Sequence, residues 1–319
     1  MKKALITLLL CVVSLPLWAG LNPAADLVAS GRIDEAMKVL NDRLTSNPRD
    51  AEAYNLRARA YFAVKKWDAA IAAAEKSVAL DPNNSDYHLW LGRAYAEKAD
   101  DSSFIVAAGL VKKVKSEFEK SVELDAHNLA AQSDLAEFYV EAPGFMGGGK
   151  GKALAQAQTI APLDAATSHW LVARVLEKDK KYPQAEAEYK AAISASHNQA
   201  SYWLNLASYY RRTGQLNNME NAVVKAMEAD KRKNDVFYDA ASLLFRAGRN
   251  FPAAAQFIRR YLTGPPVEDA PTVQAHYLLG QILEKQGDKA SAIQEYRAAL
   301  SLAKDYGQAQ DALKRLQGK

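Results

Sequence analysis

Apolar and polar positions alternate along this chain with the spacing of amphipathic helices. Between residues 200 and 214, Trp203, Leu206 and Tyr210 follow one another at intervals of three and four, with Ala207 beside them. Residues at that spacing share one face of a helix. The same arrangement returns along most of the chain, which predicts an all-helical protein built from repeated units.

The interval between equivalent positions is 34 residues. Three pairs of residues are separated by this distance: Pro48 and Pro82, Ala58 and Gly92, and Tyr61 and Tyr95. Small residues keep the spacing at Ala173, Ala207 and Ala241, as do the glycines Gly214 and Gly248. A period of this length is typical of stacked helix pairs, which cannot bury their apolar faces alone.

The residue types explain how each pair packs when repeats are numbered from 1. Small residues at positions 8 and 20 allow the two helices to approach closely, and large apolar residues at 4, 7, 11 and 24 fill the seam. Proline at position 32 ends the second helix, because it cannot continue one. Pro82 lies in such a turn, within the sequence Asp-Pro-Asn-Asn.

Trp203, Leu206, Ala207 and Tyr210 match half of the tetratricopeptide repeat signature, so the chain resembles that family over about residues 22–317. The resemblance implies an all-α, right-handed superhelical solenoid of stacked antiparallel helix pairs with a C-terminal capping helix near 305–317. We expect a partial first repeat from about Asn22 and about seven full repeats after it, which begin near Ala51, Ser85, Leu129, Ala166, Ala200, Asn234 and Val273.

The first 19 residues have the pattern of a secretory signal peptide. Lys2 and Lys3 precede an apolar run over 4–13 that is too short to span a bilayer, and Ala19 offers a cleavage site. We therefore expect a periplasmic or secreted protein, and the resemblance to exported bacterial members of the family agrees with this. An uncleaved N-terminal anchor is the alternative.

Cysteine and charge narrow the classes of function. Cys11 is the only cysteine and follows Leu10, whereas a small residue normally precedes a lipidated cysteine. Cleavage after Ala19 would leave no thiol for a disulfide or for catalysis. The net charge of +4 includes Lys2 and Lys3, so the mature balance of about +2 is too weak to indicate nucleic acid or an anionic membrane as a general partner.

The expected organisation after the signal peptide is a repeat array over 20–262, a Pro-rich spacer over 263–271, and a last repeat with its capping helix over 272–319. The spacer contains Pro265 and Pro266, which make it stiff. It adds about five residues between the last two repeats and could bend the solenoid without breaking it.

Ten extra residues fall within 100–113, because Tyr95 and Tyr139 are 44 residues apart where the period would give 34. The added segment includes the apolar residues 104–111. One interpretation is an extension of a helix that packs on its neighbour. The other is a hydrophobic lip for a partner or for the membrane surface, which leaves a peripheral envelope contact open.

A glycine-rich loop over 142–152 replaces a short turn. It partly matches a phosphate-binding loop, but Gly151 stands where Ser or Thr would hold magnesium, and a helix precedes it instead of a strand. The loop is then either a structural element in which Phe145 and Met146 act as plugs, or a small-anion site. The candidate anion residues are Gly147, Gly148, Gly149 and Lys150.

The resemblance implies that the first helix of each pair lines a concave groove that binds a protein or peptide. The candidate groove residues are Asn55, Arg59, Arg93, Trp170, Arg174, Arg211, Tyr238 and Tyr277. Arginine forks suit carboxylates, and aromatic residues suit apolar side chains. Arg59, Arg93 and Arg174 all fall at position 9. Alternatively, these arginines form ion pairs with Glu97, Glu137 and Glu177 and make a solvated lining of the groove. Trp90 occupies a slot where some family members carry asparagine to clamp a C-terminal carboxylate, so that specificity is not expected here.

We expect no catalytic residues, no metal and no cofactor. His88, His169 and His276 fall at position 4, where packing is the usual role, and no metal-ligand spacing or nucleophile elbow occurs. The sequence thus favours a non-catalytic scaffold or adaptor of the bacterial envelope. Two alternatives stay open: a small-ligand or glycan binder that uses the aromatic groove, and an accessory subunit of an enzyme with the glycine-rich loop at its site.

Overall fold

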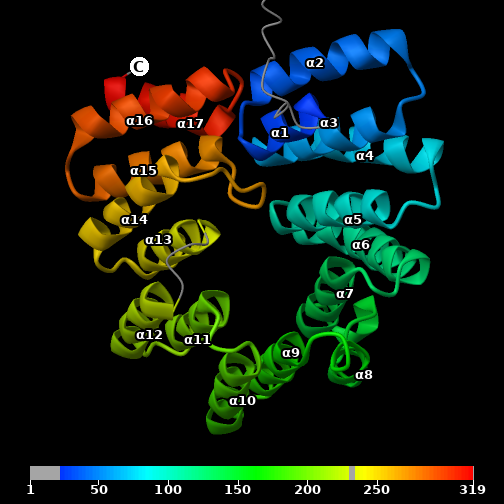
Figure 1. The fold of residues 1–319 in the computed structure, drawn as a ribbon, viewed down its shortest axis with the longest axis vertical. Helices are drawn as coiled ribbons and strands as arrows, with labels where there is room; N and C mark the ends of the chain where they lie inside the picture. Colours follow the sequence, from blue (N-terminus) through cyan, green and yellow to red (C-terminus); the bar gives the residue numbers. More distant parts are fainter. Residues whose placement is uncertain (1–21, 230–233, 319) are drawn as a thin grey trace, which may run out of the picture.

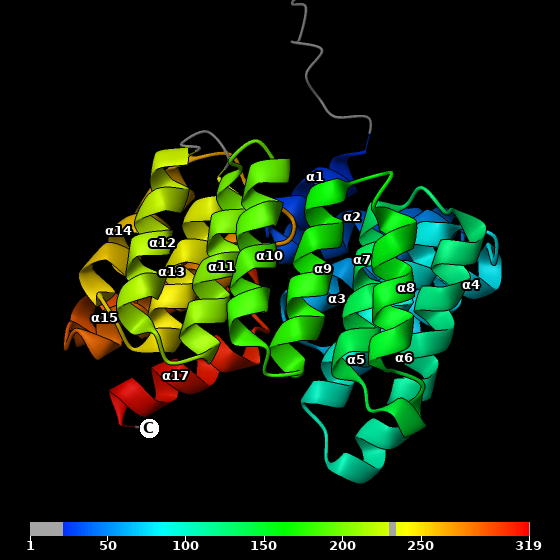
Figure 2. The same cartoon turned by 90° about the horizontal axis from the view of Figure 1, so that it is seen from below.

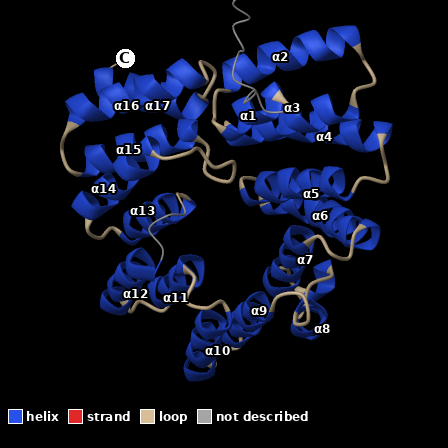
Figure 3. Ribbon diagram, in the orientation of Figure 1, coloured by secondary structure: helices blue, strands red, loops and turns tan. Residues whose placement is uncertain are grey.

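The computed structural model describes residues 22–229 and 234–318, and these form 17 α-helices and one 3₁₀ helix without a strand (Figure 3). The first half contains α1 (Pro23–Ala29), α2 (Ile33–Ser46), α3 (Ala51–Ala63), α4 (Trp67–Leu80), α5 (Ser85–Asp100), α6 (Phe104–Leu124), α7 (Leu129–Glu141), η1 (Gly144–Met146) and α8 (Lys150–Ile160). The second half contains α9 (Ala165–Lys178), α10 (Tyr182–Ala195), α11 (Ala200–Arg212), α12 (Leu216–Ala229), α13 (Asp235–Ala247), α14 (Phe251–Thr263), α15 (Thr272–Lys285), α16 (Lys289–Leu302) and α17 (Gly307–Gln317). The expected signal peptide lies outside the described residues.

Consecutive helices pack as antiparallel pairs, and the pairs stack side by side around an open centre (Figure 1). In this view the odd-numbered helices from α3 to α15 lie nearer the centre than their even-numbered partners (Figure 1). Figure 2, seen from below, shows α7 to α12 side by side along one edge of the ring. α3, α7 and α11 begin at the expected residues, and α9, α13 and α15 begin within one residue of them. The predicted all-α solenoid of helix pairs is confirmed.

Close packing within a pair depends on the small residue at position 8. A Cβ atom at Gly92 would lie 2.5 Å from the ring of Phe118, and one at Gly280 would lie 2.5 Å from the ring of Tyr296. Both aromatic residues belong to the second helix of the same pair. Because two non-bonded carbon atoms cannot lie that close, only glycine lets these helices approach as they do.

Recurring caps and turns set the helix boundaries. The side chains of Asp50, Asn128 and Asp164 each accept a hydrogen bond from a backbone N–H in the first turn of the next helix. Position 15, just after the first helix of a pair, takes left-handed backbone, with φ of 76° at Gly214 and 57° at Lys65. Glycine adopts this conformation at no steric cost, which accounts for its return at this position.

Histidine–glutamate contacts show where the ten extra residues lie. His169 Nδ1 is 2.7 Å from Glu188, and His276 makes the same contact with Glu295, in both cases across 19 residues. His88 contacts Glu117 at 2.6 Å across 29 residues. The insertion therefore falls between the two helices of the third pair and lengthens α6 at its N-terminus.

The first turn of α6 does not pack on a neighbouring helix. Phe104 and Ile105 are 73% and 84% exposed, whereas Val114 and Phe118, further along the helix, are buried in the core. The expectation that the whole apolar segment 104–111 packs on a neighbouring helix is therefore wrong for its first residues, because the extension of α6 carries them beyond the end of α5. Within the described ranges, no helix is long and apolar enough to cross a membrane.

The first and last repeats meet, so the solenoid closes into a ring (Figure 1). Gln274 Nε2 donates a hydrogen bond of 3.0 Å to the carbonyl of Ala63. One apolar cluster joins Val28 and Ile33 from the N-terminal helices with Val273 and Tyr306 from the C-terminal ones. Closure through both apolar burial and hydrogen bonds fixes the width of the central opening.

α17 covers the end of the array, as expected for residues 305–317. Its own residues Ala309 and Ala312 are buried, and Leu313 and Leu316 pack against the largest apolar cluster. The rest of the helix is mostly charged or polar. α17 thereby shields the last pair from solvent, which a terminal repeat requires.

Candidate binding cavity

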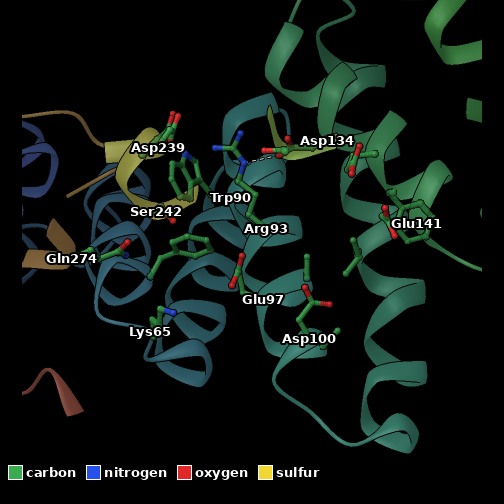
Figure 4. A pocket seen from close by; sticks show the side chains of 18 of the residues that line it. Lys65, Trp90, Arg93, Glu97, Asp100, Asp134, Glu141, Asp239, Ser242 and Gln274 are labelled. Carbon is green, nitrogen blue, oxygen red and sulfur yellow. Dashed lines mark hydrogen bonds and ion pairs between the residues drawn. The ribbon is translucent and has the colours of Figure 1, made fainter. Parts of the chain in front are cut away.

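The ring encloses a cavity of about 1090 Å³ (Figure 4). Most of its lining comes from α3, α5, α7, α11 and α13 and from the loop over 264–271, and α6 and α15 contribute further residues. Helices in register present equivalent positions to the same space, so side chains far apart in sequence converge there. The lining includes charged, polar and aromatic groups, and Figure 4 shows Trp90, Arg93 and Asp134 close together.

One wall carries two arginines that share a tryptophan. The guanidinium carbons of Arg59 and Arg93 lie 5.1 Å and 5.0 Å from the ring centre of Trp90, within cation–π range. Arg59 makes a two-bonded ion pair with Glu268, and Arg93 Nε donates to Asp134 at 2.6 Å. The charge of each arginine is therefore already matched by a carboxylate.

Arg174 belongs to a separate cluster beside this wall. Its side chain is 8% exposed and contacts Glu137 at 2.7 Å, Glu141 at 2.5 Å and Glu177 at 3.3 Å. Burial opposes the positive charge, but the surrounding carboxylates outweigh it and raise the pKa of Arg174. This pairing matches the alternative in which Glu137 and Glu177 neutralise Arg174, and Arg174 does not line the cavity.

The opposite wall, from α11 and α13, carries cations that lack such partners. Arg211 Nε is buried and has no hydrogen-bond partner. Burial and the positive charges of Arg212 and Arg246 lower the pKa of Arg211. Arg212 itself donates to Glu177 at 2.6 Å. The positive charge at Arg211 is thus held in an environment that disfavours it.

Asp239 lies on the same wall and is open to the cavity (Figure 4). Partial desolvation by the surrounding protein, together with the negative charges of Asp235 and Asp269, raises its pKa to about 6 although the side chain is exposed to the cavity, and Arg246 opposes this. Near pH 6 the carboxyl is therefore about half protonated. The charge on this wall depends on pH in a range where most carboxylates remain ionised.

The Pro-rich segment does more than separate two repeats, because it folds inward and forms part of the cavity. Asn234 Nδ2 donates to the carbonyls of Tyr261 and Pro265 at 2.7 Å and 2.9 Å, which fixes the start of the loop. The loop then places Glu268 and Asp269 in the lining. Neither acidic residue was expected at the site, since an insertion has no repeat register that could place it.

The structure brings four of the eight expected groove residues to the cavity and leaves the others elsewhere. Arg59, Arg93, Arg211 and Tyr238 line it, whereas Asn55, Trp170, Arg174 and Tyr277 do not. Asn55 is only 3% exposed, and Tyr277 packs against the rings of Tyr296 and Tyr306. Asp134, Asp239 and Arg246 also line the cavity and were not expected. Asp134 and Asp239 fall at position 6 of their repeats, and Arg246 falls at position 13, which the family resemblance gives as a usual contact position.

Two further hypotheses depended on specific neighbours. An aromatic pocket for a small ligand needed Trp170 beside Tyr238, and only Tyr238 lines the cavity. In the glycine-rich loop, the N–H groups of Gly147, Gly148 and Gly149 donate to the carbonyls of Gly144, Pro143 and Tyr139. None of the three is left free for an anion, and Lys150 is paired with Asp179. Phe145 is 81% exposed and does not act as a plug.

Within the described part of the chain, no group of three or more His, Cys, Asp or Glu side chains has a metal-binding arrangement. The three histidines at position 4 each contact a glutamate of the second helix in their own pair. Their observed contacts are those of residues that join two helices.

Comparisons with known proteins identify the repeat. Family models of the tetratricopeptide repeat match residues 24–85, 61–110, 200–233 and 273–306. The mouse protein Superkiller complex protein 3 is 22% identical over 278 residues, which are 87% of this chain and 17% of that protein. RNA polymerase II-associated protein 3 of Xenopus laevis is 30% identical over 112 residues, covering 35% of this chain and 16% of that protein.

The crystal structure of yeast Tom70 is similar with a TM-score of 0.54 at 14% identity, over 96% of this chain and 66% of the Tom70 chain. At that identity the likeness is one of fold. The chain spans less than a fifth of the length of the two curated relatives it matches. The chain contains tetratricopeptide repeats, and proteins built from them generally mediate protein–protein interaction.

Proposed function

We propose that this protein is a non-catalytic scaffold or adaptor of the bacterial envelope that binds a polypeptide partner in its central cavity. The observation that carries the proposal is the cavity itself, which is lined by the first helices of successive repeats and contains charged, polar and aromatic groups. Such a lining suits a peptide, because charged groups can hold its side chains while serines and amides can bond its main chain.

Two further observations support a binding role. The names of the two curated relatives place those proteins in a complex or in association with a polymerase. In addition, the cavity already holds a polypeptide segment, because the chain's own loop over 264–271 enters it. Together these favour binding to another protein over chemistry on a small substrate.

The envelope location rests on the N-terminal sequence. Lys2 and Lys3 before an apolar run, with a candidate cleavage site at Ala19, are typical of export. The test is to express the full chain with a C-terminal tag, fractionate the cells and sequence the N-terminus of the product. A periplasmic product that begins at Gly20 supports export, and a cytoplasmic product that begins at Met1 contradicts it.

Site-specific photocrosslinking tests where the partner binds. A photoreactive amino acid at Ser242 points the probe into the cavity, and one at Val224, which is 54% exposed on α12, serves as the control on the outside. After illumination of intact cells of the native host, mass spectrometry identifies the crosslinked polypeptides. A polypeptide that is captured repeatedly by the probe at Ser242, and not by the probe at Val224, supports the proposal. Capture only from Val224 would move the interaction to the outer face.

A further inference from the structure

Charges in the cavity are distributed unevenly between its two walls. On α3 and α5, Arg59 is paired with Glu268 and Arg93 with Asp134. On α11 and α13, neither Arg211 nor Arg246 makes an ion pair or a side-chain hydrogen bond with any residue in 22–229 or 234–318. The second wall therefore offers two guanidinium groups that a ligand could use, beside the acidic Asp239 on the same wall and Asp269 in the loop.

Arg211 has the strongest need for a partner. Its Nε is buried without an acceptor, although burial normally requires one. The charged groups that act on it are Arg212 and Arg246, which are both cationic. A bound anion would satisfy the buried N–H group and relieve the repulsion among the arginines.

The acidic groups nearest to this wall do not satisfy Arg246. Arg246 acts on Asp239 and Glu97 strongly enough to oppose the rise in the pKa of each carboxyl. Neither carboxylate lies within 4.0 Å of it as an ion pair, and Lys65 adds positive charge beside Glu97. The field near Arg246 is thus mixed, while the field at Arg211 is positive.

The chain itself shows which chemistry the cavity accepts. Glu268 reaches into it from the 264–271 loop and binds Arg59 through both carboxylate oxygens, with Nε and Nη2 as donors. This two-bonded geometry is the one in which arginine holds carboxylates most strongly. An acidic side chain on an extended polypeptide therefore fits the space and finds a matching guanidinium.

The remaining space is large enough for a peptide. Ligand pockets are usually about 300–1,000 Å³, and this cavity, at about 1090 Å³, lies just above that range. Asn205, Ser208 and Ser242 line it beside the two arginines and offer hydrogen bonds to main-chain groups.

We propose that the cavity binds an acidic segment of a partner polypeptide, and that Arg211 and Arg246 hold one of its carboxylates. This inference rests on the proposed scaffold function and adds the chemistry of the partner. Glu268 occupies the Arg59 side of the same cavity, so the ligand enters on the α11 and α13 side.

Fluorescence anisotropy with defined peptides tests the inference. The probe is a labelled peptide of aspartate, serine and glycine, and the matched peptide has asparagine in place of each aspartate. We expect the purified protein to prefer the acidic peptide, and Arg211→Gln and Arg246→Gln each to weaken its binding about tenfold, as for the loss of one charge-assisted hydrogen bond. The affinity of Arg211→Lys, which keeps the charge but loses the forked guanidinium, should lie between those of the unchanged protein and Arg211→Gln.

The control variant is Arg297→Gln, which removes the same charge from an exposed position on α16 away from the cavity. It should leave the affinity within about twofold. Circular dichroism and thermal unfolding of every variant separate lost binding from lost folding. Arg211 makes no bond within the described residues, so we expect its variants to remain folded.

Three results would overturn the inference. The acidic peptide could bind no better than the asparagine peptide, Arg297→Gln could weaken binding as much as Arg211→Gln, or free succinate could displace the peptide at equal concentration. If photocrosslinking at Ser242 still captures a polypeptide in any of these cases, the scaffold function stands and only the acidic ligand is wrong. If crosslinking also fails, both proposals fall.

Discussion

Arg59 and Glu268 are 209 residues apart in the sequence, yet their side chains form a two-bonded ion pair inside the ring. The pair joins the second repeat to the loop before the last one. It lies next to Gln274, whose side chain bonds the carbonyl of Ala63. Contacts between repeats so distant in sequence turn an open array into a closed cavity with a fixed width.

Closure of the ring depends on the apolar cluster around Val273, which is fully buried. Val273→Asp should place an unpaired charge there and lower the free energy of unfolding by about 3–5 kcal/mol, or open the ring instead. Small-angle X-ray scattering would then show a larger radius of gyration. Val224→Asp, at a position 54% exposed, should change stability by no more than about 0.5 kcal/mol. An unchanged radius and stability in Val273→Asp would contradict closure.

Gly92 permits the close approach of α5 and α6. In Gly92→Ala the new Cβ would lie 2.5 Å from the ring of Phe118. We therefore expect the free energy of unfolding, measured by chemical denaturation, to fall by about 1–3 kcal/mol. Gly109→Ala is the matched control, since nothing lies within 4 Å of its Cβ and it is inside a helix. The free energy of unfolding of Gly109→Ala should rise by up to about 1 kcal/mol. Equal effects of the two substitutions would show that the packing at Gly92 is looser than described.

Asp239 should make stability depend on pH in an unusual direction. Its pKa is about 6 in the folded protein and 3.8 in the unfolded chain, so between these values the folded state binds more protons. The free energy of unfolding should therefore fall as pH rises from about 4 to 6, and Asp239→Asn should remove that part of the slope. Urea unfolding at several pH values measures it. A slope that is unchanged in Asp239→Asn would assign the dependence to other groups.

The titration of Asp239 also reports whether the loop is inside the cavity. Asp269 is one of the two negative charges that raise the pKa of Asp239. In Asp269→Asn, carbon-detected NMR of the Asp239 carboxyl should show a midpoint below 6, because less negative charge opposes ionisation. Glu228→Gln, an exposed change on α12, provides the comparison and should leave the midpoint in place. A midpoint unaffected by Asp269→Asn would put the loop elsewhere in solution.

Phe104 and Phe118 lie on the same helix but should respond very differently to truncation. Phe118 is 4% exposed and Phe104 is 73% exposed. Phe118→Ala should lower the free energy of unfolding by about 3–5 kcal/mol, and Phe104→Ala should lower it by no more than about 0.5 kcal/mol. Thermal or urea unfolding of both variants measures the difference. A large loss in Phe104→Ala would mean that the N-terminal turn of α6 packs on the protein after all.

The 34-residue repeat, the helical class and the starts of the first helices of most pairs can be predicted from the sequence alone. Spacings of three and four residues identify a helix face, and a period of 34 identifies the pair, because both follow from local backbone geometry. Position 8 had to be small for the same reason, and Gly92 and Gly280 confirm it. The ten-residue insertion was also visible, since it shifted Tyr139 out of register with Tyr95.

Which residues meet across the ring depends on how all the repeats stack. Asn55 and Tyr277 fall at groove positions by register, but local packing buries the first and turns the second toward Tyr296 and Tyr306. Glu268 has no repeat register, and only the curvature summed over the six stacked pairs from α3 to α14 brings it to Arg59. Small rotations between neighbouring repeats accumulate along a solenoid. Whether the two ends meet is therefore a property of the whole array that no single repeat encodes.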